Sequence, residues 1–174
     1  GIILFNYGGF DSNIKLQNIA NDVATTVKAA QISGSSGKFD ARMAGAIPAY
    51  RPTYGVYFKK ESNTSLPDSF TYFVDLPNGG VINDFILDLT PEEIKTISFL
   101  NGFSIDTICY NIKTDPNNTS CGTEATATFT RPDLFAHLPD GIGGTYGDID
   151  ITIKAPNGMM KTLVIYASGA MSIE

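Results

Sequence analysis

A helical pattern of apolar residues near the start of the chain constrains its fold more than any other feature. Between residues 11 and 33, apolar side chains recur every three or four positions, which places them on one side of a helix. This stripe consists of Leu16, Ile19, Ala20, Val23, Val27 and Ala30. The opposite side is polar and carries Asn18, Asn21, Asp22, Thr25 and Lys28. We therefore predict an amphipathic helix that packs on a sheet. The residues expected to form its core contacts are Leu16, Ile19, Val23 and Val27.

Residues at both ends of this pattern favour a helix over 11–33. The side chain of Asp11 or Ser12 can accept a hydrogen bond from the free N–H groups of the first turn. Gly34, which is followed by two serines and Gly37, is typical of a helix end.

The hydrophobic period changes to two after residue 52, which is typical of strands. Residues 34–52 contain glycines and prolines without a sustained period, so we expect a surface loop there. Residues 115–118 are expected to form a turn, across which the strand at 124–130 pairs with the strand at 105–112. Residues 90–93 are compatible with one helical turn or with a bend. The expected strands cover 53–58, 70–74, 81–89, 94–99, 105–112, 124–130, 149–153, 161–166 and 171–173.

One helix followed by many short strands predicts an α+β fold, with an N-terminal amphipathic helix packed on antiparallel sheet. The 174 residues suit one domain, which is large enough to bury about two-thirds of the surface of its unfolded chain. We expect a single domain over 1–174, with an apolar segment at 1–10, the helix at 11–33 and a β-rich head at 53–174.

The composition limits the possible partners. Charged residues make up 17% of the chain, while Gly, Thr, Asn and Ser are plentiful, which is typical of secreted or surface proteins. The net charge of −6 argues against nucleic acid binding, because phosphates require a basic face. We expect neither a signal peptide nor a transmembrane helix within the sequence, since the latter needs about 20 apolar residues. A first residue other than Met indicates a processed or truncated chain.

The two cysteines, Cys109 and Cys121, lie close together in the sequence. An even number at this spacing, in a chain with few lysines, favours a disulfide over two free thiols. Cys109 shares its strand parity with Thr107 and Asn111, so it is expected on the polar face of its strand. Cys121 is expected just past the turn.

Catalytic candidates are few. His137 is the single histidine, so a Ser-His-Asp or Cys-His arrangement would have to use it, yet no nucleophile-elbow sequence occurs. The segment 141–147 is similar to a glycine-rich phosphate loop, but it leads into a strand rather than a helix. We therefore interpret His137 as a bystander and 141–147 as a surface loop.

Metal sites are also weakly indicated. Zinc needs several Cys or His ligands, and the chain has too few of them. Asp140, Asp148 and Asp150 could supply oxygen ligands to Ca²⁺, although their spacing matches no EF-hand loop. A pair of carboxylates for glycoside hydrolysis stays open, but the chain contains no Trp on which a sugar could stack. We expect no enzymatic activity and no cofactor.

The N-terminal block also resembles a known family. Apolar residues lead into F-N-Y-x-x-F-x-S-N and then x-L-x-N-I-A-x-D-V-A-x-x-V-K-x-A-Q over residues 5–31. This block resembles the N-terminal helix of type IV pilins and type II secretion pseudopilins, above all the H-type minor pseudopilins and related fimbrial pilins. Residues 163–173 resemble the last hairpin of that group. The family's Gly-Phe-Thr-Leu-Ile-Glu start and long apolar helix do not occur in this sequence.

The resemblance implies a structural role without catalysis. Residues 1–10 would be the remnant of the apolar N-terminal segment, and Ile2, Ile3, Leu4 and Phe5 would take part in assembly. The expected partners are other pilin subunits, contacted through the N-terminal helix. The full-length form would be anchored in the inner membrane before assembly and would then lie in a filament at the cell surface. The alternative is a secreted adhesin or a carbohydrate-binding β-rich module.

Overall fold

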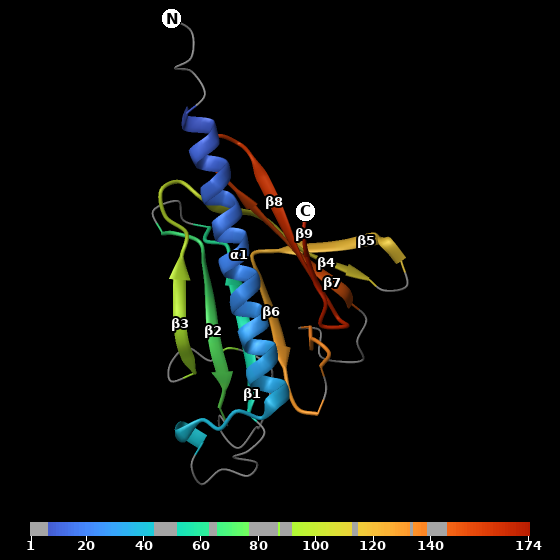
Figure 1. Ribbon diagram of the computed structural model, residues 1–174. Coiled ribbons are helices and arrows are strands. Elements are labelled where there is room, and N and C mark those ends of the chain that lie inside the picture. Colours follow the sequence, from blue (N-terminus) through green and yellow to red (C-terminus); the bar gives the residue numbers. More distant parts are fainter. Residues whose placement is uncertain are drawn as a thin grey trace, which may run out of the picture.

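The computed structural model describes residues 7–43, 52–62, 66–76, 87, 92–112, 115–132, 134–138 and 146–174. These residues form one long helix, a short 3-10 helix at Ala41–Met43 and nine strands (Figure 1). The strands belong to two antiparallel sheets, and the helix packs against both of them. The predicted α+β fold is therefore confirmed. Within the described residues, no helix has the length and apolar character needed to cross a membrane.

The helix α1 spans Tyr7–Ser36 and is longer at both ends than predicted. Asp11 and Ser12 lie inside it, so the prediction that one of them caps its start is wrong. An ion pair between Lys15 Nζ and Asp11 Oδ2, at 2.6 Å and one turn apart, instead supports the helix at this end.

The helix α1 ends at Ser36, and the glycine that terminates it is Gly37 rather than Gly34. The backbone N–H of Gly37 donates to the Gly34 carbonyl (3.1 Å), and that of Lys38 donates to the Ser33 carbonyl (3.0 Å). This is the Schellman arrangement, which needs a left-handed residue after the helix, and Gly37 has a φ of 63°. Gly34 itself is helical and buried, and a Cβ there would lie 2.1 Å from the carbonyl oxygen of Phe129. Close packing explains Gly34, and the predicted helix stop at this residue is wrong.

The first sheet has the strand order β3-β2-β1-β6. Its strands are β1 (Thr53–Lys59), β2 (Ser69–Asp75), β3 (Glu93–Ser98) and β6 (Glu124–Phe129). Large side chains of β1 lie opposite small ones of β6, because Val56 pairs with Ala127 and Phe58 pairs with Ala125. The small side chains leave room for the neighbouring layers, and all four of these residues are buried.

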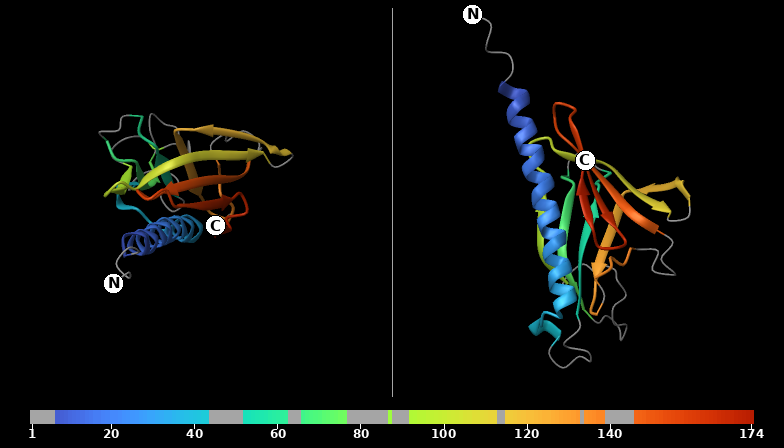
Figure 2. Two further views of the ribbon diagram at one scale, coloured as in Figure 1. Left: turned by 90° about the horizontal axis from the view of Figure 1, so that it is seen from above. Right: turned by 45° about the vertical axis from the view of Figure 1, so that its right-hand side comes forward.

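The second sheet has the order β5-β4-β7-β8-β9. Its strands are β4 (Ser104–Ile112), β5 (Asp115–Gly122), β7 (Tyr146–Lys154), β8 (Met160–Tyr166) and β9 (Met171–Ile173). Ile149, Ile151 and Ile153 alternate along β7 and are fully buried. They join the helix stripe and the first sheet in one hydrophobic core. Figure 2 shows α1 on one side of the molecule, alongside both sheets.

The helix stripe is central to this core. Leu16 is 1% exposed, and Val23 and Val27 are 0% exposed. Ile19 is half-buried and packs at the edge of the core. The polar residues predicted on the opposite side of the helix are all exposed.

One strand pairing differs from the prediction. Residues 115–118 belong to β5 rather than to a turn, and β5 is the partner of β4. The strand β6, expected beside β4, pairs with β1 in the other sheet. An alternating pattern predicts that a strand exists and which face is apolar, but not its partner, since pairing is non-local. The predicted strand at 81–89 lies outside the described residues except for Leu87.

Candidate functional site

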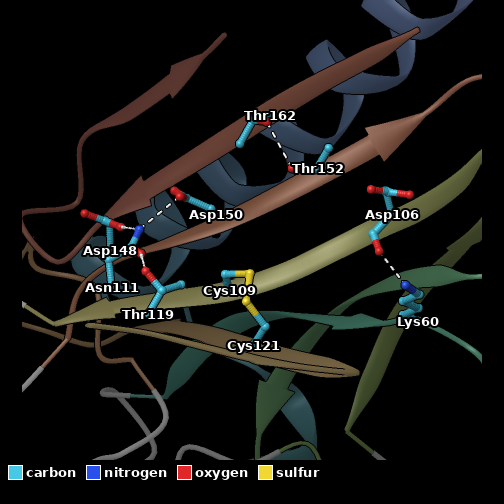
Figure 3. Close-up of a disulfide and its surroundings, with 10 residues drawn as sticks. All are labelled: Lys60, Asp106, Cys109, Asn111, Thr119, Cys121, Asp148, Asp150, Thr152 and Thr162. Carbon is cyan, nitrogen blue, oxygen red and sulfur yellow. Dashed lines mark hydrogen bonds between the residues drawn. A yellow bond between two sulfur atoms is a disulfide. The ribbon is translucent and has the colours of Figure 1, made fainter. Parts of the chain in front are cut away.

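The predicted disulfide joins the neighbouring strands β4 and β5. Cys109 and Cys121 lie directly opposite each other, with 4.0 Å between their Cα atoms (Figure 3). So short a distance is typical of a non-hydrogen-bonded antiparallel pair, where side chains approach most closely. The bond therefore fastens an outer strand of the second sheet to its neighbour. Cys121 lies within the strand β5, which also contains residues 115–118 that were predicted to form the turn before it.

Polar side chains join three strands beside this disulfide. The Asn111 Nδ2 group in β4 donates to Asp148 Oδ1 (2.5 Å) and to Asp150 Oδ2 (2.9 Å), both in β7. Thr119 Oγ1 in β5 donates to Asn111 Oδ1 (2.9 Å). Figure 3 shows this row of side chains on the same side of the sheet as the disulfide. The face that Cys109 was expected to share with Asn111 is thus polar.

The two aspartates of this row lie close enough to influence each other. Burial raises the pKa of Asp150 above its ordinary value, the hydrogen bond from Asn111 opposes this shift, and the charges of Asp148 and Glu174 add to it. Two of the three calcium candidates therefore lie side by side, but Asn111 already donates to both. Asp140 lies outside the described residues. Within the described residues, no group of three or more His, Cys, Asp or Glu is arranged to hold a metal.

The N-terminal part of α1 extends beyond the core. Asp11, Asn13, Ile14 and Lys15 are exposed, and Leu16 is the first buried residue of the helix whose burial is described. Nine helical residues, 7–15, precede Leu16, which corresponds to about 14 Å of helix at 1.5 Å per residue. The proposed assembly residues Ile2, Ile3, Leu4 and Phe5 lie outside the described residues.

Two clefts lie near this end of the helix. The larger has a volume of about 710 Å³, and its lining includes Leu66, Leu100 and Pro156. The smaller, of about 320 Å³, lies between α1 and the end of β3, and its lining includes Ile19, Ile97 and Leu100. Leu100 lines both clefts, so they are neighbours.

Asp68, which lines the larger cleft, was not singled out from the sequence. Its Oδ1 accepts a hydrogen bond from the Glu61 backbone N–H (2.6 Å), and its Oδ2 accepts one from that of Ile105 (2.6 Å). Its own carbonyl accepts from the Phe99 N–H (2.8 Å). One buried aspartate thus holds three separate segments together. The only sequence signal was an Asp between a proline and a strand.

Lys60 links the two sheets. Its backbone N–H donates to the Thr123 carbonyl (2.7 Å), and its Nζ donates to the Asp106 carbonyl in β4 (Figure 3). The Asp106 side chain in turn lies 3.6 Å from Lys154 Nζ. This arrangement fixes the geometry of the cleft and accounts for its polar side.

The two side chains considered as catalytic candidates, His137 and Cys109, both lie in structural arrangements. His137 forms an isolated backbone bridge with Thr128 of β6, so its main chain extends that edge of the sheet. Cys109 has no thiol, since it is in the disulfide. Most of the glycine-rich segment, 141–145, lies outside the described residues, and Tyr146 begins β7.

The described chain is an α+β domain with an N-terminal helix packed against two antiparallel sheets. Comparisons with protein-family models, with curated proteins and with solved structures find no match to it.

Proposed function

We propose that this protein is a non-catalytic structural subunit, a pilin or pseudopilin, of a filament related to type IV pili or type II secretion pseudopili. One observation carries the proposal. The long helix α1 packs on the sheets from Leu16 onward, while Asp11, Asn13, Ile14 and Lys15 ahead of it are exposed. A helix that projects from its own domain can pack against the helices of other subunits. Residues 7–31 of the sequence block that resembles that of pilins lie in this helix.

Burial of apolar helices supplies the cohesion in such an assembly. Full burial of one large aliphatic side chain contributes about 1.5–3 kcal/mol. Association costs roughly 4–15 kcal/mol in lost translational and rotational freedom. Ile2, Ile3, Leu4 and Phe5, if partly buried, are expected to offset only part of that cost. The proposal therefore includes a longer apolar segment ahead of residue 1, which would anchor the subunit in the inner membrane before assembly.

The disulfide agrees with a position outside the cytosol. Disulfides persist in oxidising compartments and on cell surfaces. In this chain the bond fastens the outer strand β5, whose residues from Thr119 to Gly122 are exposed. A strand exposed at the surface of a filament would be held in place by this bond.

The experiment compares two lengths of the protein in cells that have a pilus machine. One is the 174-residue chain with a cleavable signal peptide, and the other carries about 20 apolar residues and a prepilin leader ahead of residue 1. Electron microscopy with antibodies against the head should detect only the longer form in filaments. A matched control replaces the apolar segment with a Gly/Ser segment of equal length.

The outcome that rejects this function is equally specific. If the longer form is processed but never enters a filament, the chain is better described as a secreted binding module.

A further inference from the structure

The disulfide lies on an accessible face at the outer edge of the second sheet. Cys121 belongs to the outermost strand β5 and is exposed, while Cys109 in β4 is half-buried. Side chains alternate along β4, so Cys109 lies on the face opposite to that of Ile108, which is in the hydrophobic core. A dissolved thiol can therefore reach this bond in the folded protein, whereas a bond enclosed in a core is reached only after unfolding.

Two carboxylates flank the inner side of this bond (Figure 3). Cys109 lies directly opposite Cys121 in the pairing with β5, and directly opposite Asp150 in the pairing with β7. Side chains in such positions share a face, and their Cβ atoms are about 4.5–5.5 Å apart. Asp148 lies on the same face, two residues before Asp150, and Asn111 donates to both carboxylates (2.5 and 2.9 Å). These hydrogen bonds hold the two carboxylates beside Cys109.

The charges that act on Asp150 are negative. Burial raises the pKa of Asp150, the hydrogen bond from Asn111 lowers it, and the charges of Asp148 and Glu174 raise it further. No lysine or arginine among the described residues contributes to this shift. The carboxylates beside the disulfide are therefore not offset by a cation in this part of the described structure.

The lysines of the two adjoining strands lie elsewhere. Lys154 of β7 comes four residues after Asp150, about 13 Å along the strand, and is paired with Asp106 (3.6 Å). Lys161 of β8 lies directly opposite Ile153, so it is on the core face of the sheet and not on the face of the disulfide. The face around the disulfide is thus acidic.

The direction of approach differs between the two sulfur atoms. In thiol–disulfide exchange, a thiolate anion attacks one sulfur in line with the S–S bond, and the other sulfur leaves as a thiolate. In-line attack on Cys109 would come from the side of β7, where Asp150 lies. In-line attack on Cys121 comes from the outer side of β5, where the described residues place no further strand. Attack on Cys121 is therefore favoured.

We propose that the Cys109–Cys121 bond is a thiol-exchange site, which is opened at Cys121 and is selective for thiols that carry or adjoin a positive charge. The carboxylates of Asp148 and Asp150 repel an anionic thiol and attract a cationic one. This property belongs to the 174-residue chain itself and does not depend on the proposed function.

The exchange takes place in two steps. A thiolate RS⁻ forms a new S–S bond with Cys121 Sγ, and the Cys109 sulfur leaves with the electron pair of the broken bond and takes a proton from solvent. A second RS⁻ then attacks the R sulfur of the mixed disulfide, which forms RSSR and releases the Cys121 thiolate. The external thiols are oxidised by two electrons and the cysteine pair is reduced. The strand β5 is then held in the sheet by its pairing with β4 alone.

The test measures the reduction of the folded chain by small thiols of different charge. These are cysteamine (positive), 2-mercaptoethanol (neutral) and 2-mercaptoethanesulfonate (negative). The chain has no other cysteine, so the reaction reports on this bond alone. Each rate constant is calculated per thiolate and divided by that of the same thiol with 2-hydroxyethyl disulfide, an uncharged reference.

The normalised rates should depend on charge and on salt. Cysteamine should react roughly tenfold or more faster than 2-mercaptoethanesulfonate at low salt. In 1 M salt the ratio should fall to about twofold, because the screening length is then only about 3 Å. This measurement needs no variant.

The double variant Asp148→Asn/Asp150→Asn tests the two carboxylates directly. Its amide oxygens can still accept from Asn111, and far-UV circular dichroism checks that the fold is kept. The ratio of the cysteamine rate to the 2-mercaptoethanesulfonate rate should fall to about twofold or less at low salt.

The matched control is the double variant Asp22→Asn/Glu93→Gln. It also removes two negative charges, from exposed positions on α1 and β3 that lie outside the second sheet. It should keep the wild-type ratio. Lys113 lies outside the described residues and is unchanged in every variant, so its charge cancels in these comparisons.

The sulfur that is attacked is identified separately. A brief reaction with cysteamine is stopped with N-ethylmaleimide, and trypsin then cleaves after Lys113, between the two cysteines. Mass spectrometry should find cysteamine on Cys121 and the maleimide on Cys109.

Four results would overturn the proposal. The normalised rates of the three thiols could be equal, the Asp148→Asn/Asp150→Asn variant could keep the wild-type ratio, or the first adduct could form on Cys109. Reduction that occurs only in denaturant would likewise overturn it, because folding would then protect the bond.

Discussion

Gly34 of α1 lies against the Phe129 carbonyl oxygen of β6 so closely that a Cβ on residue 34 would be 2.1 Å from that oxygen. The neighbour is backbone and not the end of a flexible side chain, so one of the two elements would have to shift. Gly34→Ala should therefore lower the free energy of unfolding by about 1–3 kcal/mol through overpacking. Denaturant unfolding measures the change.

Gly122→Ala is the matched control for this substitution. The nearest atom to its added Cβ is 3.9 Å away, in ordinary contact. It should leave the free energy of unfolding within about 0.5 kcal/mol of the wild type, as surface substitutions do. Equal effects of the two changes would show that the approach of α1 to β6 is not tight.

Val23 tests the packing of the helix stripe. It is 0% exposed, so Val23→Asp would bury a carboxylate among apolar side chains. The free energy of unfolding should fall by about 4 kcal/mol or more. Thr25→Asp, two residues away on the exposed side, should change it little. A melting temperature of Val23→Asp equal to that of the wild type would disprove the assigned packing.

The disulfide should contribute roughly 3 kcal/mol to stability, because it closes a short loop in the unfolded chain. Replacing both Cys109 and Cys121 by Ser should lower the free energy of unfolding by that amount and retain the far-UV circular dichroism spectrum. A reducing agent should destabilise the wild type to the same extent and leave the double variant unchanged. Two titratable thiols in denatured, non-reduced protein would contradict the bond.

Asp150 should make stability depend on pH. Its pKa is raised in the folded state by burial, so folding favours its protonated form. Its favourable contribution is therefore present below the ordinary pKa of an aspartate and is lost as the pH rises through the raised value. Asp150→Asn keeps an oxygen that accepts from Asn111 and removes the charge. It should stabilise the protein more at pH 7 than at pH 4.

Urea unfolding at both pH values measures this difference. Asp22→Asn, at an exposed position of α1, controls for the loss of one negative charge from an acidic chain. If both substitutions give the same pH dependence, the environment of Asp150 is not responsible.

The helix and the alternating strands could be predicted because both patterns are local. The stripe from Leu16 to Val27 repeats with the helical period, and Ile149, Ile151 and Ile153 alternate as a strand does. The disulfide followed from two cysteines at close spacing. The ends of α1 were less predictable, since Gly34 is needed for packing against a strand nearly a hundred residues away.

The partners of the strands could not be predicted from the same patterns. Whether β4 pairs with β5 or with β6 depends on contacts between distant segments, and the alternation of β6 suits either neighbour. Asp68 was missed for a related reason. Its three hydrogen-bond donors come from Glu61, Phe99 and Ile105, which only the folded chain brings together.

The packing of α1 against both sheets has a mechanical consequence. If the protein is a filament subunit, as proposed, tension on the filament would transmit load to each head through the helix, parallel to the axis of α1. The stripe from Leu16 to Ala30 contacts β1 and β6 of one sheet and β7 and β8 of the other. The load would therefore act in shear on all of these contacts at once, and not open them one by one. Withdrawal of the helix would require the whole stripe to slip at once. The head should therefore resist force applied along the axis of α1.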